Sequence, residues 1–112
     1  MPAKILQINF RLNTSTPEYQ KLCQSVAQAF AGVRGLRWKI WLLNEGGKEA
    51  GGIYLFESDQ ALNDFLSGPL AAQVKGHPAL SDFSAKGFDV MEGVTAITRG
   101  PIPAIAAAAG SV

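Results

Sequence analysis

The segment WKIWLLNEGGKEAGGIYLF, residues 38–56, decides the fold, because it predicts two β-strands joined by a turn that contains glycine. The second strand opens with Gly51 and Gly52. Glycine inside a strand loses more backbone entropy than other residues and offers no side chain for packing, so it typically marks a bulge, a bend or a close approach. We therefore expect another group to lie against the backbone at this pair.

The length of the hairpin loop determines which residues face one another. A five-residue loop, 44–48, places Trp41 opposite Gly51 and Trp38 opposite Tyr54, with the two pairs on opposite faces of the sheet. A tryptophan spread over a cross-strand glycine is a familiar stabilising pair. A loop one residue shorter changes these pairings, and the sequence is compatible with either length.

Two further strands and two helical regions are predicted around this hairpin. Apolar residues at every second position predict a first strand, whose other face carries polar residues including Asn9 and Arg11. Thr16 as N-cap and Pro17 in the first turn predict the first helix, and Ser58 or Asp59 caps a second helical region that Gly68 and Pro69 interrupt. The predicted strands are 4–12, 36–43, 50–56 and 82–90, and the first helix is 17–31.

This β-α-β-β-α-β order predicts a ferredoxin-like α+β fold, a four-stranded antiparallel sheet with two helices on one face. We expect a single domain over residues 1–98 and a Pro/Ala-rich C-terminal tail over 99–112 that is extended or mobile. The helices cover one face of the sheet, yet the two hairpin strands carry large apolar side chains on both faces. We therefore expect a second copy on the other face, in a homodimer.

Composition excludes several classes of protein. A net charge of +1 argues against a nucleic-acid partner, and the single cysteine excludes an internal disulfide framework and a cysteine-rich zinc site. The start of the chain, MPAKILQINF, alternates where a signal peptide would have an apolar run, and apolar stretches are too short to cross a membrane. We expect a soluble cytoplasmic protein without membrane contact.

Three segments resemble one known family. GLRWKIWLLNEGGKEAGGIYLFES (35–58), with ILQINF (5–10) before it and AKGFDVME (85–92) after it, is similar to the YdhR-like mono-oxygenases of the dimeric α+β barrel superfamily, which is related to the antibiotic-biosynthesis mono-oxygenases. The resemblance covers about residues 4–95. It implies a homodimer whose two sheets face each other, with a small cavity between sheet and helices in each subunit.

The resemblance also implies a type of chemistry. Relatives in the wider superfamily oxidise phenolic substrates with molecular oxygen, without metal or flavin, so we expect a mono-oxygenase that acts on a small aromatic or quinone-like molecule with no cofactor. Two alternatives fit the same residues: a binding or stress-response module without chemistry, and a non-oxidative isomerase or decarboxylase.

Three polar residues are candidates for catalysis. Asn9 either lines a wet cavity or is hydrogen-bonded in a dimer interface, because a buried polar group needs a partner. Lys39 either extends to water or stabilises an anionic substrate oxygen with a pKa lowered by desolvation. His77, the only histidine, is either a solvated residue in a turn or a proton shuttle.

Four more residues are candidates for binding substrate. Trp38, Trp41 and Tyr54 line a pocket or pack in the core or the dimer interface, and Arg11 lies on the polar face of the first strand. Haem is disfavoured, because the second helical region has no tryptophan and His77 precedes a proline. No pattern of metal ligands appears, and Cys23 is interpreted as a buried, inert thiol.

Overall fold

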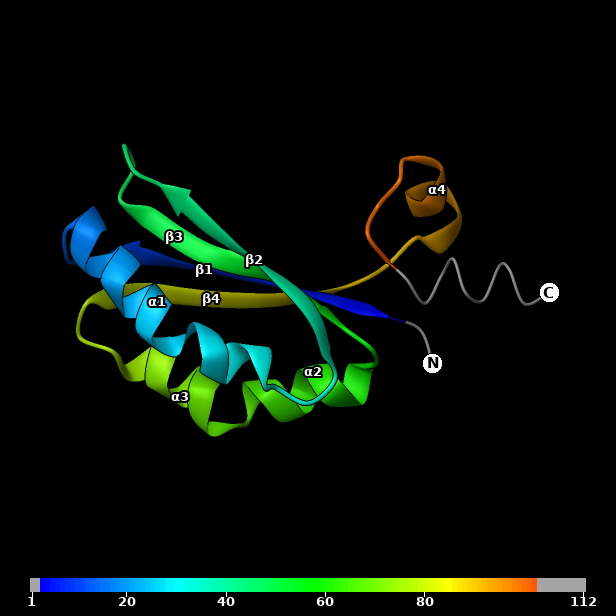
Figure 1. Cartoon of the computed structure of the whole chain (residues 1–112), viewed down its shortest axis with the longest axis horizontal. Coiled ribbons are helices and arrows are strands. Elements are labelled where there is room, and N and C mark those ends of the chain that lie inside the picture. Colours follow the sequence, from blue (N-terminus) through cyan, green and yellow to red (C-terminus); the bar gives the residue numbers. More distant parts are fainter. Residues whose placement is uncertain (1–2, 103–112) are drawn as a thin grey trace.

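The computed structural model describes residues 3–102 and has the predicted ferredoxin-like topology (Figure 1). The second helical region is broken into two helices at Gly68 and Pro69, as predicted. One short helix, α4, was not predicted. In chain order the elements are β1 Lys4–Leu12, α1 Thr16–Ala31, β2 Leu36–Asn44, β3 Glu49–Phe56, α2 Asp59–Leu66, α3 Pro69–Gly76, β4 Leu80–Asp89 and α4 Glu92–Ile97.

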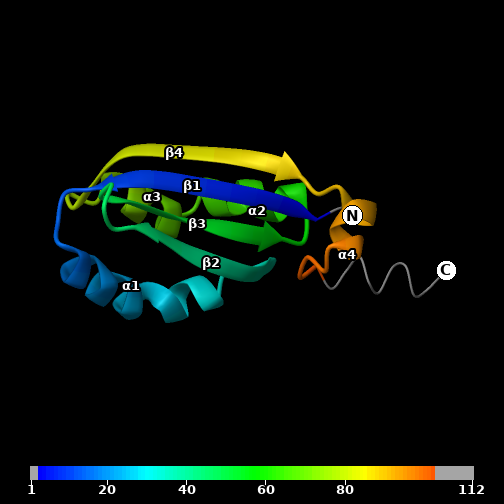
Figure 2. The same cartoon turned by 90° about the horizontal axis from the view of Figure 1, so that it is seen from above.

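The sheet has the order β2-β3-β1-β4, and every pair is antiparallel. Helices α1, α2 and α3 lie on one face of it, and α4 lies beyond its end (Figures 1 and 2). The main core is buried between these three helices and the sheet, and it is built on alternate residues of β1 and β3. Its strand residues are Leu6, Ile8, Phe10, Leu12, Ala50, Tyr54 and Phe56.

Serine side chains begin two of the helices. Ser15 accepts a hydrogen bond from the Glu18 amide at 3.3 Å, so it caps α1 in place of the predicted Thr16, which lies in the first turn. Ser58 accepts from the Ala61 amide at 3.1 Å and is the cap of α2.

The hairpin has the shorter of the two loops. Asn44 pairs with Glu49, and its side chain accepts a hydrogen bond from the Gly47 amide at 3.3 Å, which ties the turn to the strand. The pairings predicted from the five-residue loop are therefore wrong. Trp41 faces Gly52, Trp38 faces Leu55, and Tyr54 faces Lys39.

The predicted close approach at the glycine pair is confirmed by the atoms that lie nearest to each glycine. A β-carbon on Gly51 would lie 1.9 Å from the Ile8 carbonyl oxygen on β1. A β-carbon on Gly52 would lie 2.9 Å from Cε of Lys39 and 3.2 Å from the ring of Tyr54. Gly51 thus admits the neighbouring strand, and Gly52 admits a lysine side chain.

The far face of the sheet carries a second, smaller cluster. Ala3, Leu55 and Ile102 are buried together there, and Trp38 packs against them. The Trp38 indole donates a hydrogen bond to the Pro101 carbonyl at 2.6 Å. The chain after α4 thus returns to the sheet as far as Ile102, and the rest of the predicted tail lies outside the described residues.

Gly51 provides a stability test with a matched control. Replacing Gly51 with Ala should lower the free energy of unfolding by about 3 kcal/mol, because the added methyl group forces β1 and β3 apart. Gly46→Ala, in the same hairpin, has no atom within 4 Å of the added carbon and should change stability little. Urea denaturation measures both, and equal stabilities of the two variants would contradict the assigned contact.

Candidate active site: an aromatic cavity around Lys39

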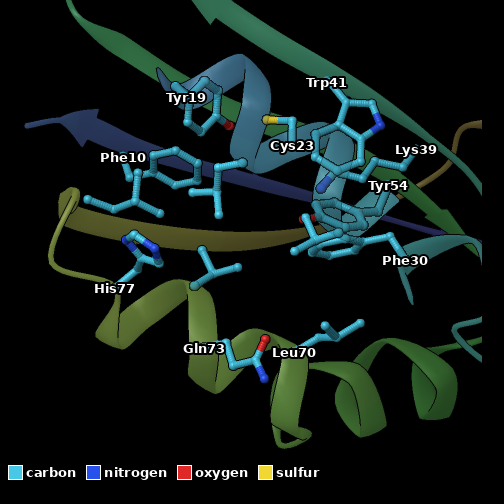
Figure 3. Close-up of a pocket in the computed structure, with 15 residues that line it drawn as sticks. Phe10, Tyr19, Cys23, Phe30, Lys39, Trp41, Tyr54, Leu70, Gln73 and His77 are labelled. Atoms are coloured by element: carbon cyan, nitrogen blue, oxygen red, sulfur yellow. The ribbon is translucent and has the colours of Figure 1, made fainter. Parts of the chain in front are cut away.

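A cavity of about 90 Å³ lies between the helical layer and the sheet (Figure 3). Aromatic and aliphatic side chains form most of its wall, with a few polar groups among them. Its lining residues are Phe10, Tyr19, Leu22, Cys23, Val26, Phe30, Lys39, Trp41, Gly51, Tyr54, Leu70, Gln73, Val74, His77 and Leu80.

The amine of Lys39 is enclosed by three aromatic rings. Its Nζ lies 3.4 Å from the ring centre of Trp41, 3.6 Å from that of Phe30 and 4.7 Å from that of Tyr54. The register produces this arrangement, because Lys39 faces Tyr54 across the hairpin and crosses the space left by Gly52. Phe30 reaches the amine from α1 and meets Trp41 edge to face at 5.4 Å.

Burial changes the protonation of this amine. It lowers the pKa of Lys39 to about 7, since a cation in an apolar site loses its hydration, while the nearby Cys23 acts in the opposite direction. Within residues 3–102, no Asp or Glu pairs with this side chain, in contrast to the ion pairs of Lys4 and Arg37. Both the neutral and the charged amine are therefore populated near neutral pH.

The pKa values of the acidic groups that line the cavity shift upward. Burial raises the pKa of Tyr19, Tyr54 and Cys23. All three remain protonated near neutral pH, so each has a hydrogen to donate. Cys23 is half-buried and lines the cavity, and its raised pKa makes it a weak nucleophile.

His77 and Gln73 provide the polar groups on the α3 side of the cavity. The amide of Ala79 donates a hydrogen bond to Nδ1 of His77 at 3.0 Å. In a neutral imidazole the remaining nitrogen, Nε2, is then the donor. Figure 3 shows His77 well separated from Lys39, with Phe10 and Tyr19 on the same side of the view as His77.

The structure divides the predicted site residues between the two faces of the sheet. Lys39, Trp41, Tyr54 and His77 line the cavity. Asn9, Arg11 and Trp38 do not, because their positions in β1 and β2 alternate with those that face the helices. Asn9 instead accepts a hydrogen bond from the Gln7 side chain at 3.0 Å on the far face.

Several lining residues were not predicted as site residues. Tyr19, Cys23, Val26 and Phe30 recur at helical spacing, a pattern that also describes an ordinary core face. Gln73 was missed as well, and its position on an apolar helix was the one available signal. In the described range 3–102, no three His, Cys, Asp or Glu side chains form a possible metal site, and no helix is long and apolar enough to cross a membrane.

Fold and cavity together define a ferredoxin-like protein with an apolar site between sheet and helices. The family model described as "Putative mono-oxygenase ydhR" matches residues 5–101. The chain therefore belongs to this mono-oxygenase family. A search of curated proteins gives no match.

Solved structures share the fold. The cofactor-independent oxygenase SnoaB of Streptomyces nogalater is 16% identical, with a TM-score of 0.65 over 80% of this chain and 94% of that one. The haem-degrading MhuD of Mycobacterium tuberculosis is 24% identical, with a TM-score of 0.61 over 78% and 95%. A dimeric ferredoxin-like protein of unknown function from Thermobifida fusca is 17% identical, with a TM-score of 0.61 over 80% and 93%. At these identities the likeness shows the fold alone.

The lowered pKa of Lys39 predicts a pH-dependent stability. Between about pH 7 and 8.5 the unfolded lysine binds a proton that the folded lysine loses, so stability rises with pH. The contribution of this one group has a slope of up to about 1.4 kcal/mol per pH unit. The difference in unfolding free energy between wild type and Lys39→Met isolates the contribution of Lys39, since the two proteins share all other titrating groups. A difference that does not change over this interval would contradict a lowered pKa.

Proposed function

We propose that this protein is a cofactor-independent mono-oxygenase that oxidises a small aromatic or quinone-like molecule in the cavity around Lys39. The observation that carries the proposal is a half-buried amine, enclosed by three aromatic rings, that is partly neutral near pH 7. Family membership supports the reaction type. SnoaB, which has the same fold, is a cofactor-independent oxygenase, and this supports a reaction without a cofactor.

Lys39 would act as the general base. Its neutral amine takes the acidic proton of a phenol or of an activated ring carbon, and the ammonium that forms stabilises the resulting anion. This electron-rich anion supplies the electrons that reduce oxygen. For a ring CH₂ group, one oxygen atom becomes the new carbonyl, the other leaves as water with the two hydrogens, and no external reductant is consumed.

The other cavity residues would orient the substrate. Phe30, Trp41 and Tyr54 offer ring faces for stacking, and the protonated Tyr19 can donate to a substrate oxygen. His77 and Gln73 provide a second polar contact away from the amine, which favours a substrate that is polar at both ends.

Entry requires side chains to move. The present volume of about 90 Å³ is below the roughly 150 Å³ of a protein cavity that binds benzene. Trp41 is 37% exposed, and surface grooves flank it on both sides between α1 and β2. Rotation of Trp41 and Lys39 toward these grooves would enlarge the cavity, so we assign this edge as the entrance.

Haem fits this site poorly. MhuD binds two haems in its active site, whereas the cavity here is far smaller than the roughly 300–1,000 Å³ typical of ligand pockets. The one histidine near it already uses Nδ1 for the Ala79 amide, and the α3 residues that line the cavity are Leu70, Gln73 and Val74. We derive no step through haem.

We also propose that the protein is a homodimer whose two far sheet faces pack together. Ile40 is 49% exposed on this face and Phe88 on β4 is 45% exposed, although both lie in the sheet. The dimeric relative from Thermobifida fusca has the same fold. A second copy would remove these side chains from water.

Oxygen uptake tests the enzymatic proposal. With anthrones and phenols as substrates, Lys39→Met should lower kcat/KM by about 100-fold or more, the usual contribution of a general base. The wild-type rate should rise with pH and level off above about 7, as the amine becomes neutral. Lys21→Met makes the same chemical change on the exposed side of α1 and should retain activity.

Two other results of this experiment would indicate a different function. If an aromatic ligand raises the melting temperature without oxygen uptake or product, the protein is a binding module. Turnover without oxygen uptake would indicate an isomerase or decarboxylase.

Sedimentation tests the dimer. Ile40→Glu places a charge on the far face and should convert the dimer to a single chain at micromolar concentration. Leu66→Glu introduces the same charge at a partly exposed position of α2, on the helical side, and should leave the mass unchanged. A wild-type protein that sediments as a single chain would refute the proposal.

A further inference from the structure

We propose that the Lys39 amine captures small apolar aldehydes covalently, as an imine formed inside the aromatic cavity. This activity is separate from the proposed oxygenation. It requires the amine and the cavity, but neither oxygen nor an acidic substrate.

The surroundings of Lys39 suit a nucleophilic amine. Its Nζ is held against the rings of Phe30, Trp41 and Tyr54, and no described carboxylate pairs with it. The lone pair of a neutral lysine is the nucleophile in imine formation, and desolvation in an apolar pocket activates it.

The titratable groups around the amine leave it free to react. They are Tyr19 and Cys23 from α1, Tyr54 from β3 and His77 at the end of α3. Arg37, the other charged residue in the adjoining groove, is paired with Glu57 at 3.3 Å. Tyr19, Cys23 and Tyr54 stay protonated, so they do not anchor the amine as an ammonium ion.

The chemistry needs no further reactant. The lone pair of Nζ attacks the carbonyl carbon, and a proton moves from nitrogen to oxygen to give a carbinolamine. A donor such as Tyr19 can protonate the departing hydroxyl, and water leaves as a C=N bond joins Lys39 to the aldehyde carbon. The nitrogen then returns its remaining proton to that donor, which leaves a neutral imine. An apolar, poorly hydrated cavity favours this loss of water.

The cavity also limits which aldehydes fit. Its wall is mostly apolar, and its volume of about 90 Å³ accepts a short alkyl chain more readily than a ring. Butanal should therefore react faster than benzaldehyde, whose ring needs a larger movement of Trp41 to enter.

The other lysines have different environments. Lys4 forms ion pairs with Asp59 and Asp89, which raise its pKa. Lys48 lies exposed in the hairpin turn and provides a reference for an ordinary surface amine. At pH 7 an ordinary lysine is neutral in less than about one molecule in a thousand.

Reductive trapping tests the inference. The full chain is incubated with butanal and cyanoborohydride at pH 7, and the butyl adduct on each lysine is quantified by peptide mass spectrometry. Lys39 should be labelled at least about 10-fold faster than Lys48, since its lowered pKa leaves about half of its amine neutral at pH 7. The labelling rate of Lys39 should level off as the pH rises past about 7 and the amine becomes neutral.

Three controls make the result specific. Lys39→Arg keeps a cation but should lose the fast adduct, and Val74→Phe should slow labelling of Lys39 by filling the cavity while Lys48 is unaffected. Circular dichroism confirms that each variant is folded. In concentrated urea the two lysines of the wild type should react at the same rate.

Labelling of Lys39 no faster than Lys48 in the native wild type would overturn the inference. Fast labelling that persists in Val74→Phe would also overturn it, because the cavity would then have no part in the reaction. Either result leaves the oxygen-uptake experiment as an independent test of the proposed function.

Discussion

The pairing of Lys39 with Tyr54 across the β2–β3 hairpin is the constraint on which the site depends. This register directs Lys39 and Trp41 toward the helices and Trp38 toward the far face. Gly52 leaves room for this side chain, because a β-carbon there would lie 2.9 Å from Cε of Lys39. The glycine pair and the lysine therefore form one structural unit, although thirteen positions separate Lys39 from Gly52 in the sequence.

A charged lysine at position 39 lowers the stability of the fold. An aliphatic residue at position 39 would pack among the three rings without any charge to desolvate. The ammonium group of a lysine loses hydration there, and this desolvation lowers its pKa to about 7. Cation–π contacts with Trp41 and Phe30 offset part of that cost. A half-buried amine in an apolar cavity, with no Asp or Glu of residues 3–102 paired to it, is typical of a functional group rather than a structural one.

The two faces of the sheet differ in what they contain. The helical face contains the cavity and the main core, and the far face contains a small cluster around Leu55 and Trp38 beside exposed apolar side chains. Alternation along each strand separates the two sets, so Asn9 on β1 and Lys39 on β2 lie on opposite faces. The candidate residues were chosen by residue type alone, and they are therefore divided between the two faces of the sheet.

The sequence by itself determined the element order, the ferredoxin-like topology, the helix break at Gly68 and Pro69, and the close approach at Gly51 and Gly52, since these follow from periodicity and from local backbone chemistry. It also identified Lys39, Trp41, Tyr54 and His77 as candidates. Only the tertiary structure decided which candidates meet, because a one-residue change in loop length reverses the face of every side chain in a strand. It likewise brought Phe30 of α1 to the amine, a contact between distant segments that no local pattern encodes.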